Sequence, residues 1–204
     1  IYVNPLQFGA HEDFGAYPRT PGADRALAEK AGVDLLFRPE EEESYPLGKE
    51  HATTVEVAGL GNTLCGMFRA GHFRGVATVV ARLFNMVAPD VALFGRKDYQ
   101  RLRVVERRVK DLSMPIAIIG VETVREPDGL AMSSRNMYLT PEERRVASRL
   151  YATLCAARDS AVAASAALTE VERNGVLSLS SAGFIPEYVS IRRQADLAPP
   201  ELED

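Results

Sequence analysis

Over residues 1–122, segments whose apolar residues have the spacing of a helix alternate with segments whose composition is typical of a strand. Apolar residues recur at the spacing of one helix face within 76–87 and again within 102–112. Thr20-Pro21 predicts a further helix that Gly32 ends. Short β-rich runs predict strands at 1–3, 33–37, 53–57, 91–94 and 115–124. This alternation is typical of a parallel sheet with helical crossovers.

The remaining residues, 123–204, have a different pattern. Thr140-Pro141-Glu142-Glu143 is a capping box that predicts a long helix starting at Pro141, and 187–191 reads as a strand. We therefore predict a parallel α/β domain over 1–122 and a smaller α+β domain over 123–204.

Composition narrows the class of protein. The 204 residues are 46% hydrophobic and 25% charged with a net charge of −4, which is ordinary for a globular protein and argues against a nucleic-acid binder. No apolar run is long enough to cross a bilayer. Cys65 and Cys155 are isolated in the sequence, so we expect neither a disulfide framework nor a zinc site. We expect the protein to work in a reducing cytoplasm. The basic helix after 95 is interpreted as a solvated face rather than a nucleic-acid patch.

The first candidate site follows the strand at 91–94. Gly95-Arg96-Lys97-Asp98 would place backbone N–H groups, a lysine and a carboxylate at a helix start. Lys97 would neutralise phosphate oxygens, and Asp98 would hold magnesium or a ribose hydroxyl. The alternative is that Lys97 lies in an ordinary surface turn.

The second candidate site is the loop 127–140, between the strand at 115–124 and the helix at Pro141. It carries the hydroxyls of Ser133 and Ser134 and the guanidinium of Arg135, which can offer paired donors to phosphate. With Met132 and the first candidate site, this loop predicts a two-sided nucleotide clamp.

Uncharged polar groups follow the strand at 1–3. Asn4, Gln7 and Tyr17 lie where ligands bind in parallel α/β sheets, although they could simply satisfy loop backbone. His72 precedes the helix at 76–87, where an anion would be favoured, or it could be a structural hydrogen-bonding residue.

Five motifs together resemble one enzyme family, pantothenate synthetase, also called pantoate–β-alanine ligase. They are Ile-Tyr-Val-Asn-Pro-Leu-Gln-Phe (1–8), Ala-Tyr-Pro-Arg-Thr (16–20), Gly-His-Phe-Arg-Gly-Val (71–76), Phe-Gly-Arg-Lys-Asp-Tyr-Gln (94–100) and Asp-Gly-Leu-Ala-Met-Ser-Ser-Arg-Asn (128–136). The resemblance covers essentially the whole chain in the same order.

The resemblance implies a Rossmann-like domain of the adenylyltransferase type, ATP, Mg²⁺ and a homodimer. It also implies a two-step reaction. The pantoate carboxylate attacks the α-phosphorus of ATP and releases pyrophosphate, and the amine of β-alanine then attacks the pantoyl adenylate and releases AMP. Catalysis would rest on positioning and on stabilising phosphate charge.

The family's functional positions transfer to residues of this sequence. Gln7, Asn4 and Arg101 would bind pantoate, and Asp24 would lie near magnesium. Lys97, Arg135, Ser133 and Ser134 would carry the chemistry. ATP would be bound by Gly95, Arg96, Lys97, Asp98, Val124, Met132, Ser133, Ser134 and Arg135, with Val124 holding adenine through its backbone.

The chain also departs from the family. The family's His-x-Gly-His loop precedes the point where this chain starts, and its C-terminal hairpin is absent after Leu197, so we expect residues 1–204 alone to show little activity. Cys65 and Arg96 each replace a Glu, and Arg101 replaces a Gln. These differences leave two alternatives: a catalytically silent relative that binds nucleotide or dimerises, or an adenylyl-transfer ligase with another acid substrate.

Overall fold

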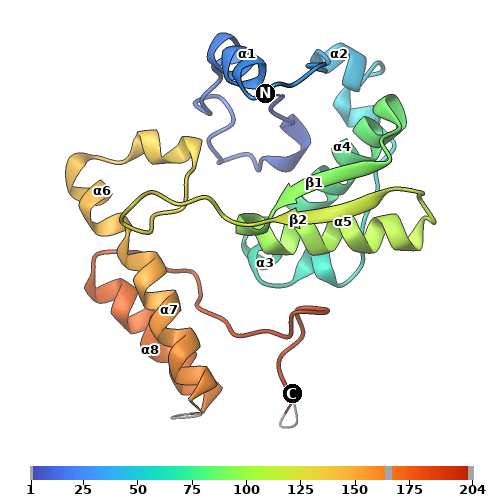
Figure 1. Cartoon of the computed structure of the whole chain (residues 1–204). Helices are drawn as coiled ribbons and strands as arrows, with labels where there is room; N and C mark the ends of the chain where they lie inside the picture. Colours follow the sequence, from blue (N-terminus) through green and yellow to red (C-terminus); the bar gives the residue numbers. More distant parts are fainter. Residues whose placement is uncertain (1, 164–166, 202–204) are drawn as a thin grey trace. The chain divides into compact units, whose positions relative to one another are not determined.

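The computed structural model describes residues 2–163 and 167–201 (Figure 1). They divide into two compact units. Unit 1 holds residues 2–94 and 100–119, and unit 2 holds 95–99 together with the described residues from 120 onward. The domain boundary predicted after residue 122 stays a prediction.

Unit 1 begins with short helices joined by irregular segments. The helix predicted at Thr20-Pro21 is confirmed, and Gly32 follows it with a positive φ of 78°. The elements before α4 are η1 (Pro5–Gln7), α1 (Pro21–Lys30), α2 (Glu41–Ser44), η2 (Lys49–His51), η3 (Leu60–Asn62) and α3 (Cys65–Phe68).

Three predicted strands of this region are wrong. Residues 2–3, 33–37 and 53–57 form no strand within the described part of the chain. Leu35 is 81% exposed, so this apolar run packs against little. An extended segment becomes a strand only when its N–H and C=O groups find a partner strand, which a short apolar run cannot guarantee.

Helix α4 (His72–Val87) forms the centre of unit 1. Its apolar face, with Val76, Val80 and Phe84 buried, packs on α5 (Tyr99–Asp111) through Val105 and Val109. The helix begins four residues before the predicted start at 76, because Gly71 takes a left-handed conformation (φ 77°) that ends the preceding turn. His72 therefore lies in the first turn of α4 rather than in a loop.

Strands β1 (Val91–Gly95) and β2 (Ala117–Val121) are neighbours in one sheet and are connected by α5 (Figure 1). This βαβ order gives parallel strands and confirms the predicted α/β class. Ala92, Phe94 and Ile118 pack against the core of α4 and α5. The alternate positions along both strands are exposed, so one face of this sheet carries the core.

Three of the basic side chains of α5 are engaged within the helix or buried. Arg103 pairs with Glu106, and Arg107 pairs with Asp111. Arg108 is 1% exposed, donates to the Ala77 carbonyl at 2.8 Å and stacks over the Phe84 ring. Burial lowers the pKa of Arg108 to about 10.

Unit 2 is mainly helical. After η4 (Arg96–Asp98), it contains η5 (Ser134–Tyr138), α6 (Pro141–Ala147), α7 (Arg149–Val162) and α8 (Leu168–Ser181). The predicted capping box is confirmed, since the Thr140 side chain accepts from Glu143 N and the Glu143 carboxylate accepts from Thr140 N. The predicted long helix is divided at Ser148, and no strand forms at 187–191.

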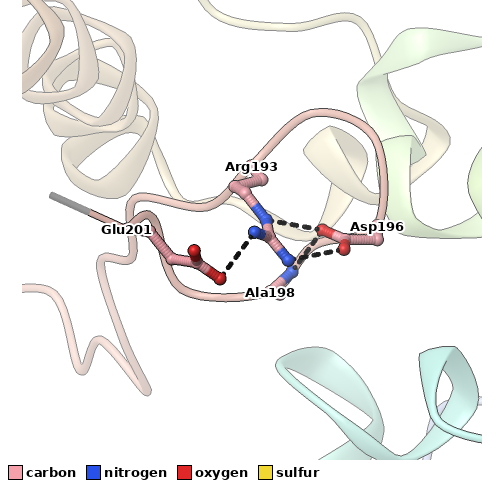
Figure 2. A network of polar contacts seen from close by, with 4 residues as sticks. All are labelled: Arg193, Asp196, Ala198 and Glu201. Carbon is pink, nitrogen blue, oxygen red and sulfur yellow. Dashed lines mark hydrogen bonds and ion pairs between the residues drawn. The ribbon is translucent and has the colours of Figure 1, made fainter. Parts of the chain in front are cut away.

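The last described residues form a turn held by one arginine (Figure 2). The Arg193 guanidinium binds the carboxylates of Asp196 and Glu201, and its backbone N–H donates to the Ala198 carbonyl at 2.9 Å. The neighbouring Gln194 carbonyl accepts a bond from the Tyr99 hydroxyl at 3.2 Å. The turn is therefore joined to the segment that carries Lys97 and Asp98.

Within residues 2–163 and 167–201, no helix has the length and apolar character needed to cross a membrane.

Candidate functional site

In unit 1, the candidate acid-binding residues gather where η1 meets the start of α4. Gly75 makes this contact possible. A Cβ at this position would lie 2.1 Å from the Leu6 carbonyl oxygen and 2.7 Å from Gln7 N. Only glycine lets the backbone that carries Gln7 approach the helix so closely.

Asn4 fixes the entry to η1. Its side chain is 3% exposed and accepts bonds from the Tyr45 hydroxyl at 2.6 Å and from Leu6 N at 3.4 Å. Its amide nitrogen donates to the Gly75 carbonyl at 3.2 Å. Asn4 therefore joins three segments far apart in the sequence, and its polar atoms serve the scaffold directly.

His72 holds the other side of this junction. Its Nδ1 lies 2.7 Å from the Gln7 carbonyl oxygen, which can only accept, so Nδ1 carries the proton. Nε2 then accepts from Arg69, 3.3 Å away. Burial lowers the pKa of His72, and the charges of Arg69 and Arg101 lower it further against the opposing bond to Gln7. The contacts favour the structural interpretation of His72.

A partly buried ion pair adjoins His72. The Arg69 guanidinium binds both carboxylate oxygens of Glu12, with Nε 2.9 Å from Oε1, and this hydrogen bonding lowers the pKa of Glu12. The Cys65 thiol also lies against Arg69. Arg101 projects from α5 in the same unit, and its charge acts on His72.

The candidate nucleotide-binding residues lie in unit 2. Gly95, Arg96, Lys97 and Asp98 are all exposed at the end of β1, and η4 leads directly into α5. Arg96 binds the Glu122 carboxylate at 2.7 Å, so an exposed ion pair joins η4 to the residues after β2.

The segment after β2 makes a short hairpin that ends in η5. Arg125 and Ala131 form an antiparallel bridge, and Met132 N donates to the Val124 carbonyl at 3.0 Å. Val124 is 67% exposed and Met132 is 53% exposed. The predicted adenine contact and the first predicted phosphate contact are thus hydrogen-bonded to each other.

Ser133, Ser134 and Arg135 follow this hairpin. The Ser133 hydroxyl accepts from Arg135 N at 3.2 Å and caps η5, while the Asn136 amide donates to the Ala131 carbonyl at 3.1 Å. Ser134 and Arg135 are exposed, and they lie in the same compact unit as Lys97. These contacts fix the backbone and leave an exposed surface of polar side chains suited to phosphate oxygens.

The predicted magnesium residue, Asp24, lies in the first turn of α1. Its Oδ1 accepts from the Thr20 hydroxyl at 3.1 Å. Among the residues that the structure describes, no three His, Cys, Asp or Glu side chains gather into a metal cage.

Three residues that assemble the unit 1 junction, Gly75, Glu12 and Tyr45, were not predicted from the sequence. Gly75 lies inside the quoted motif at 71–76, so the motif itself was the available signal. Glu12 and Tyr45 gave no signal, because Glu12 pairs with an arginine 57 positions away and Tyr45 bonds a side chain 41 positions away.

Known proteins match this chain along its full length. The family model for pantoate–β-alanine ligase matches residues 1–204. A pantothenate synthetase of Methylococcus capsulatus is 51% identical over 204 residues, which are all of this chain and 71% of the relative. A pantothenate synthetase of Alkalilimnicola ehrlichii is 53% identical over 98% of this chain and 70% of the relative.

Solved structures give the same family. The pantothenate synthetase of Thermus thermophilus superposes with a TM-score of 0.89 at 50% identity, covering 98% of this chain and 72% of that one. The pantoate–β-alanine ligase of Francisella tularensis, complexed with β,γ-ATP and β-alanine, superposes with a TM-score of 0.75 at 34% identity. The match covers 90% of this chain and 66% of that one. The resemblance found in the motifs is confirmed, and the chain belongs to the pantoate–β-alanine ligase family.

Proposed function

We propose that this chain carries out the ATP-dependent condensation of pantoate with β-alanine. The carboxylate oxygen of pantoate forms a bond to the α-phosphorus, and the bond to pyrophosphate breaks. The β-alanine nitrogen then forms the amide bond, and AMP leaves with the bonding electron pair. The observation that carries the proposal is the family match over residues 1–204.

Unit 2 supplies the nucleotide contacts in this proposal. Lys97 and Arg135 neutralise phosphate charge as it develops, and Ser133 and Ser134 donate hydroxyl hydrogen bonds to the same oxygens. Gly95 and Asp98 contact ATP from the two ends of η4, with Arg96 held beside them by Glu122. Support comes from the exposure of these polar groups on a hydrogen-bonded backbone.

The hairpin completes the nucleotide contacts. Val124 binds adenine through its backbone, and Met132 lies against the phosphate-binding residues. Support comes from the bond between Met132 N and the Val124 carbonyl, which couples the two contact points.

Unit 1 supplies the acid contacts. The Gln7 side chain binds pantoate, and Asn4 orients η1 through its bonds to Tyr45 and Gly75. Arg101 adds a cation that attracts the carboxylate. A cation paired with the attacking oxygens also weakens them as nucleophiles, so Arg101 sets a balance between binding and reactivity.

Mg²⁺ enters this proposal with ATP. Asp98, next to Lys97, is our first candidate ligand for this ion, and Asp24 is a second. When bound, the ion neutralises phosphate charge and makes pyrophosphate a better leaving group. We further propose that the protein works as a cytoplasmic homodimer, as the family resemblance implies.

The test is pantoate-dependent exchange of labelled pyrophosphate into ATP, measured on the protein purified from its natural gene. We expect exchange with pantoate that exceeds exchange with other hydroxy acids. ATP binding without exchange would support the silent relative, and preference for another acid would remove pantoate from the proposal. Arg101 and Cys65 are the residues that motivate the comparison of acids.

A further inference from the structure

The hairpin between Val124 and Met132 is docked by its tip onto the helices that follow it. Within the hairpin, Glu126 N donates to the Leu130 carbonyl at 2.8 Å, and Gly129 N donates to the Glu126 carbonyl at 2.9 Å. The bond between Met132 N and the Val124 carbonyl closes its base. Because the hairpin is closed at both ends, whatever fixes its tip also fixes the two residues at its base.

The first contact at the tip is made by Arg125 and Tyr151 of α7. The Arg125 guanidinium carbon lies 3.6 Å from the centroid of the Tyr151 ring, and Nη1 donates to the Gly129 carbonyl at 3.1 Å. The arginine thus joins the aromatic ring of the helix to the turn of the hairpin. A cation stacked on an aromatic face in this way is attracted by the electron density of the ring.

Gly129 lets the turn lie directly on this ring. Its φ is 90°, and a Cβ there would lie 2.9 Å from Tyr151 Cδ1. A side chain at this position would be strained and would push the turn away from α7.

The second contact is made by Asp128 and Arg144 of α6. Arg144 Nη1 lies 2.5 Å from Asp128 Oδ2, while Asp128 Oδ1 accepts from Leu130 N at 3.1 Å. The neighbouring Arg145 binds Glu142 of its own helix at 2.9 Å. Of these two adjacent arginines, Arg144 is therefore the one engaged with the hairpin.

We propose that Arg125 and Tyr151 are positioning residues for the nucleotide, and that Arg144 assists them through Asp128. They hold the hairpin on α6 and α7, so that Val124, Met132 and the Ser133–Arg135 segment are ordered before ATP arrives. This ordering reduces the conformational entropy that nucleotide binding must overcome. The inference rests on the proposed ATP-dependent ligation and extends it to side chains that touch no substrate in that proposal.

Variants of Tyr151 test the inference by steady-state kinetics on the protein from its natural gene. Tyr151→Leu removes the aromatic face, and we expect about a tenfold rise in KM for ATP with KM for pantoate changed by less than about twofold. Tyr151→Phe keeps the aromatic face, so both KM values should stay at their wild-type level. Equal rises in both KM values for Tyr151→Leu, or an unchanged KM for ATP, would overturn the inference.

Adjacent arginines provide a matched pair. Arg144→Ala should raise KM for ATP by about threefold, whereas Arg145→Ala, in the same helix, should leave it unchanged. Equal effects from the two substitutions would show that α6 does not position the hairpin.

Amide hydrogen exchange gives a readout independent of turnover. We expect faster exchange at 131–135 in Tyr151→Leu than in the wild type, with exchange in α4 unchanged. Unchanged exchange at 131–135 would overturn the inference. The two proposals separate cleanly: a wild-type protein without pantoate-dependent exchange contradicts the proposed function, whereas an active wild type with unaffected variants contradicts only the positioning role.

Discussion

The η1–α4 junction in unit 1 and the hairpin–η5 segment in unit 2 use polar residues in opposite ways. At the junction, Asn4 and His72 are 3% and 5% exposed, and their polar atoms bond to other parts of the scaffold. In unit 2, Lys97 and Arg135 are exposed, and the Arg135 backbone N–H is hydrogen-bonded to the Ser133 hydroxyl. A buried polar group without its partner is costly, so changes at the junction should reduce stability as well as activity. Changes at the exposed cations should reduce activity alone.

The largest effect is expected from the exposed cations. Lys97→Ala and Arg135→Ala should each slow adenylate formation by about 10²- to 10³-fold, because each removes a charge that faces the phosphates as they react. Single-turnover kinetics measures this step. The melting temperature should stay within about 2 °C of the wild type.

Tyr17→Phe is the control for these two variants and should have a far smaller effect. Equal and mild effects from all three substitutions would contradict the nucleotide clamp.

The next largest effect is expected at Gly75. Gly75→Ala would drive a methyl group against the Leu6 carbonyl, so we expect a loss of about 3 kcal/mol in the free energy of unfolding. Urea denaturation followed by circular dichroism measures this loss. Gly22→Ala in α1 is the matched control, because a Cβ there meets nothing within 4 Å. Equal stability of the two variants would show that the junction is not tightly packed.

A smaller effect is expected at Tyr45. Tyr45→Phe removes the hydroxyl that donates to buried Asn4, which should cost about 1–2 kcal/mol in the free energy of unfolding and weaken pantoate binding. Thermal unfolding and calorimetric titration with pantoate measure the two quantities. Tyr151→Phe, which also removes only a phenol hydroxyl, should change neither. A Tyr45→Phe protein as stable as the wild type would contradict the claim that the hydrogen bond from Tyr45 to Asn4 stabilises the fold.

The smallest effect concerns pH. The pKa of His72 is lowered from its ordinary value of 6.5, so between the lowered pKa and 6.5 the unfolded chain binds the proton and the folded chain does not. The contribution of His72 therefore stabilises the fold above pH 6.5 and is lost as the pH falls toward the lowered value. Urea unfolding at a series of pH values should show a weaker dependence across this window for His72→Gln. An identical dependence in both proteins would contradict the buried, neutral ring.

Long periodic segments were predictable from the sequence, and contacts between distant segments were not. Helices α4 and α5 were predicted because burial on one face imposes a repeat on the chain, whereas strands β1 and β2 were predicted from short β-rich runs. The run at 33–37 has the same apolar composition but lacks a partner strand in the described structure, so composition alone misassigned it. The bond between Asn4 and Gly75 spans 71 positions, and no local pattern encodes such a pairing.

The same distinction between local sequence patterns and contacts made by folding applies to the candidate site. Ser133–Arg135 and Gly95–Asp98 could be proposed as phosphate contacts because their residue types suit phosphate. The sequence could not predict the Arg125–Tyr151 stack or the Arg69–Glu12 ion pair, because from the sequence alone either arginine could have been a solvent-exposed residue.

Calorimetric titration of the two ligands separately tests the central claim most directly, that unit 1 residues bind the acid and unit 2 residues bind the nucleotide. With Lys97→Ala, we expect the affinity for Mg–ATP to fall by about tenfold or more and the affinity for pantoate to stay within about twofold; Gln7→Ala should give the reverse. A loss of both affinities to the same degree in either variant would contradict this division.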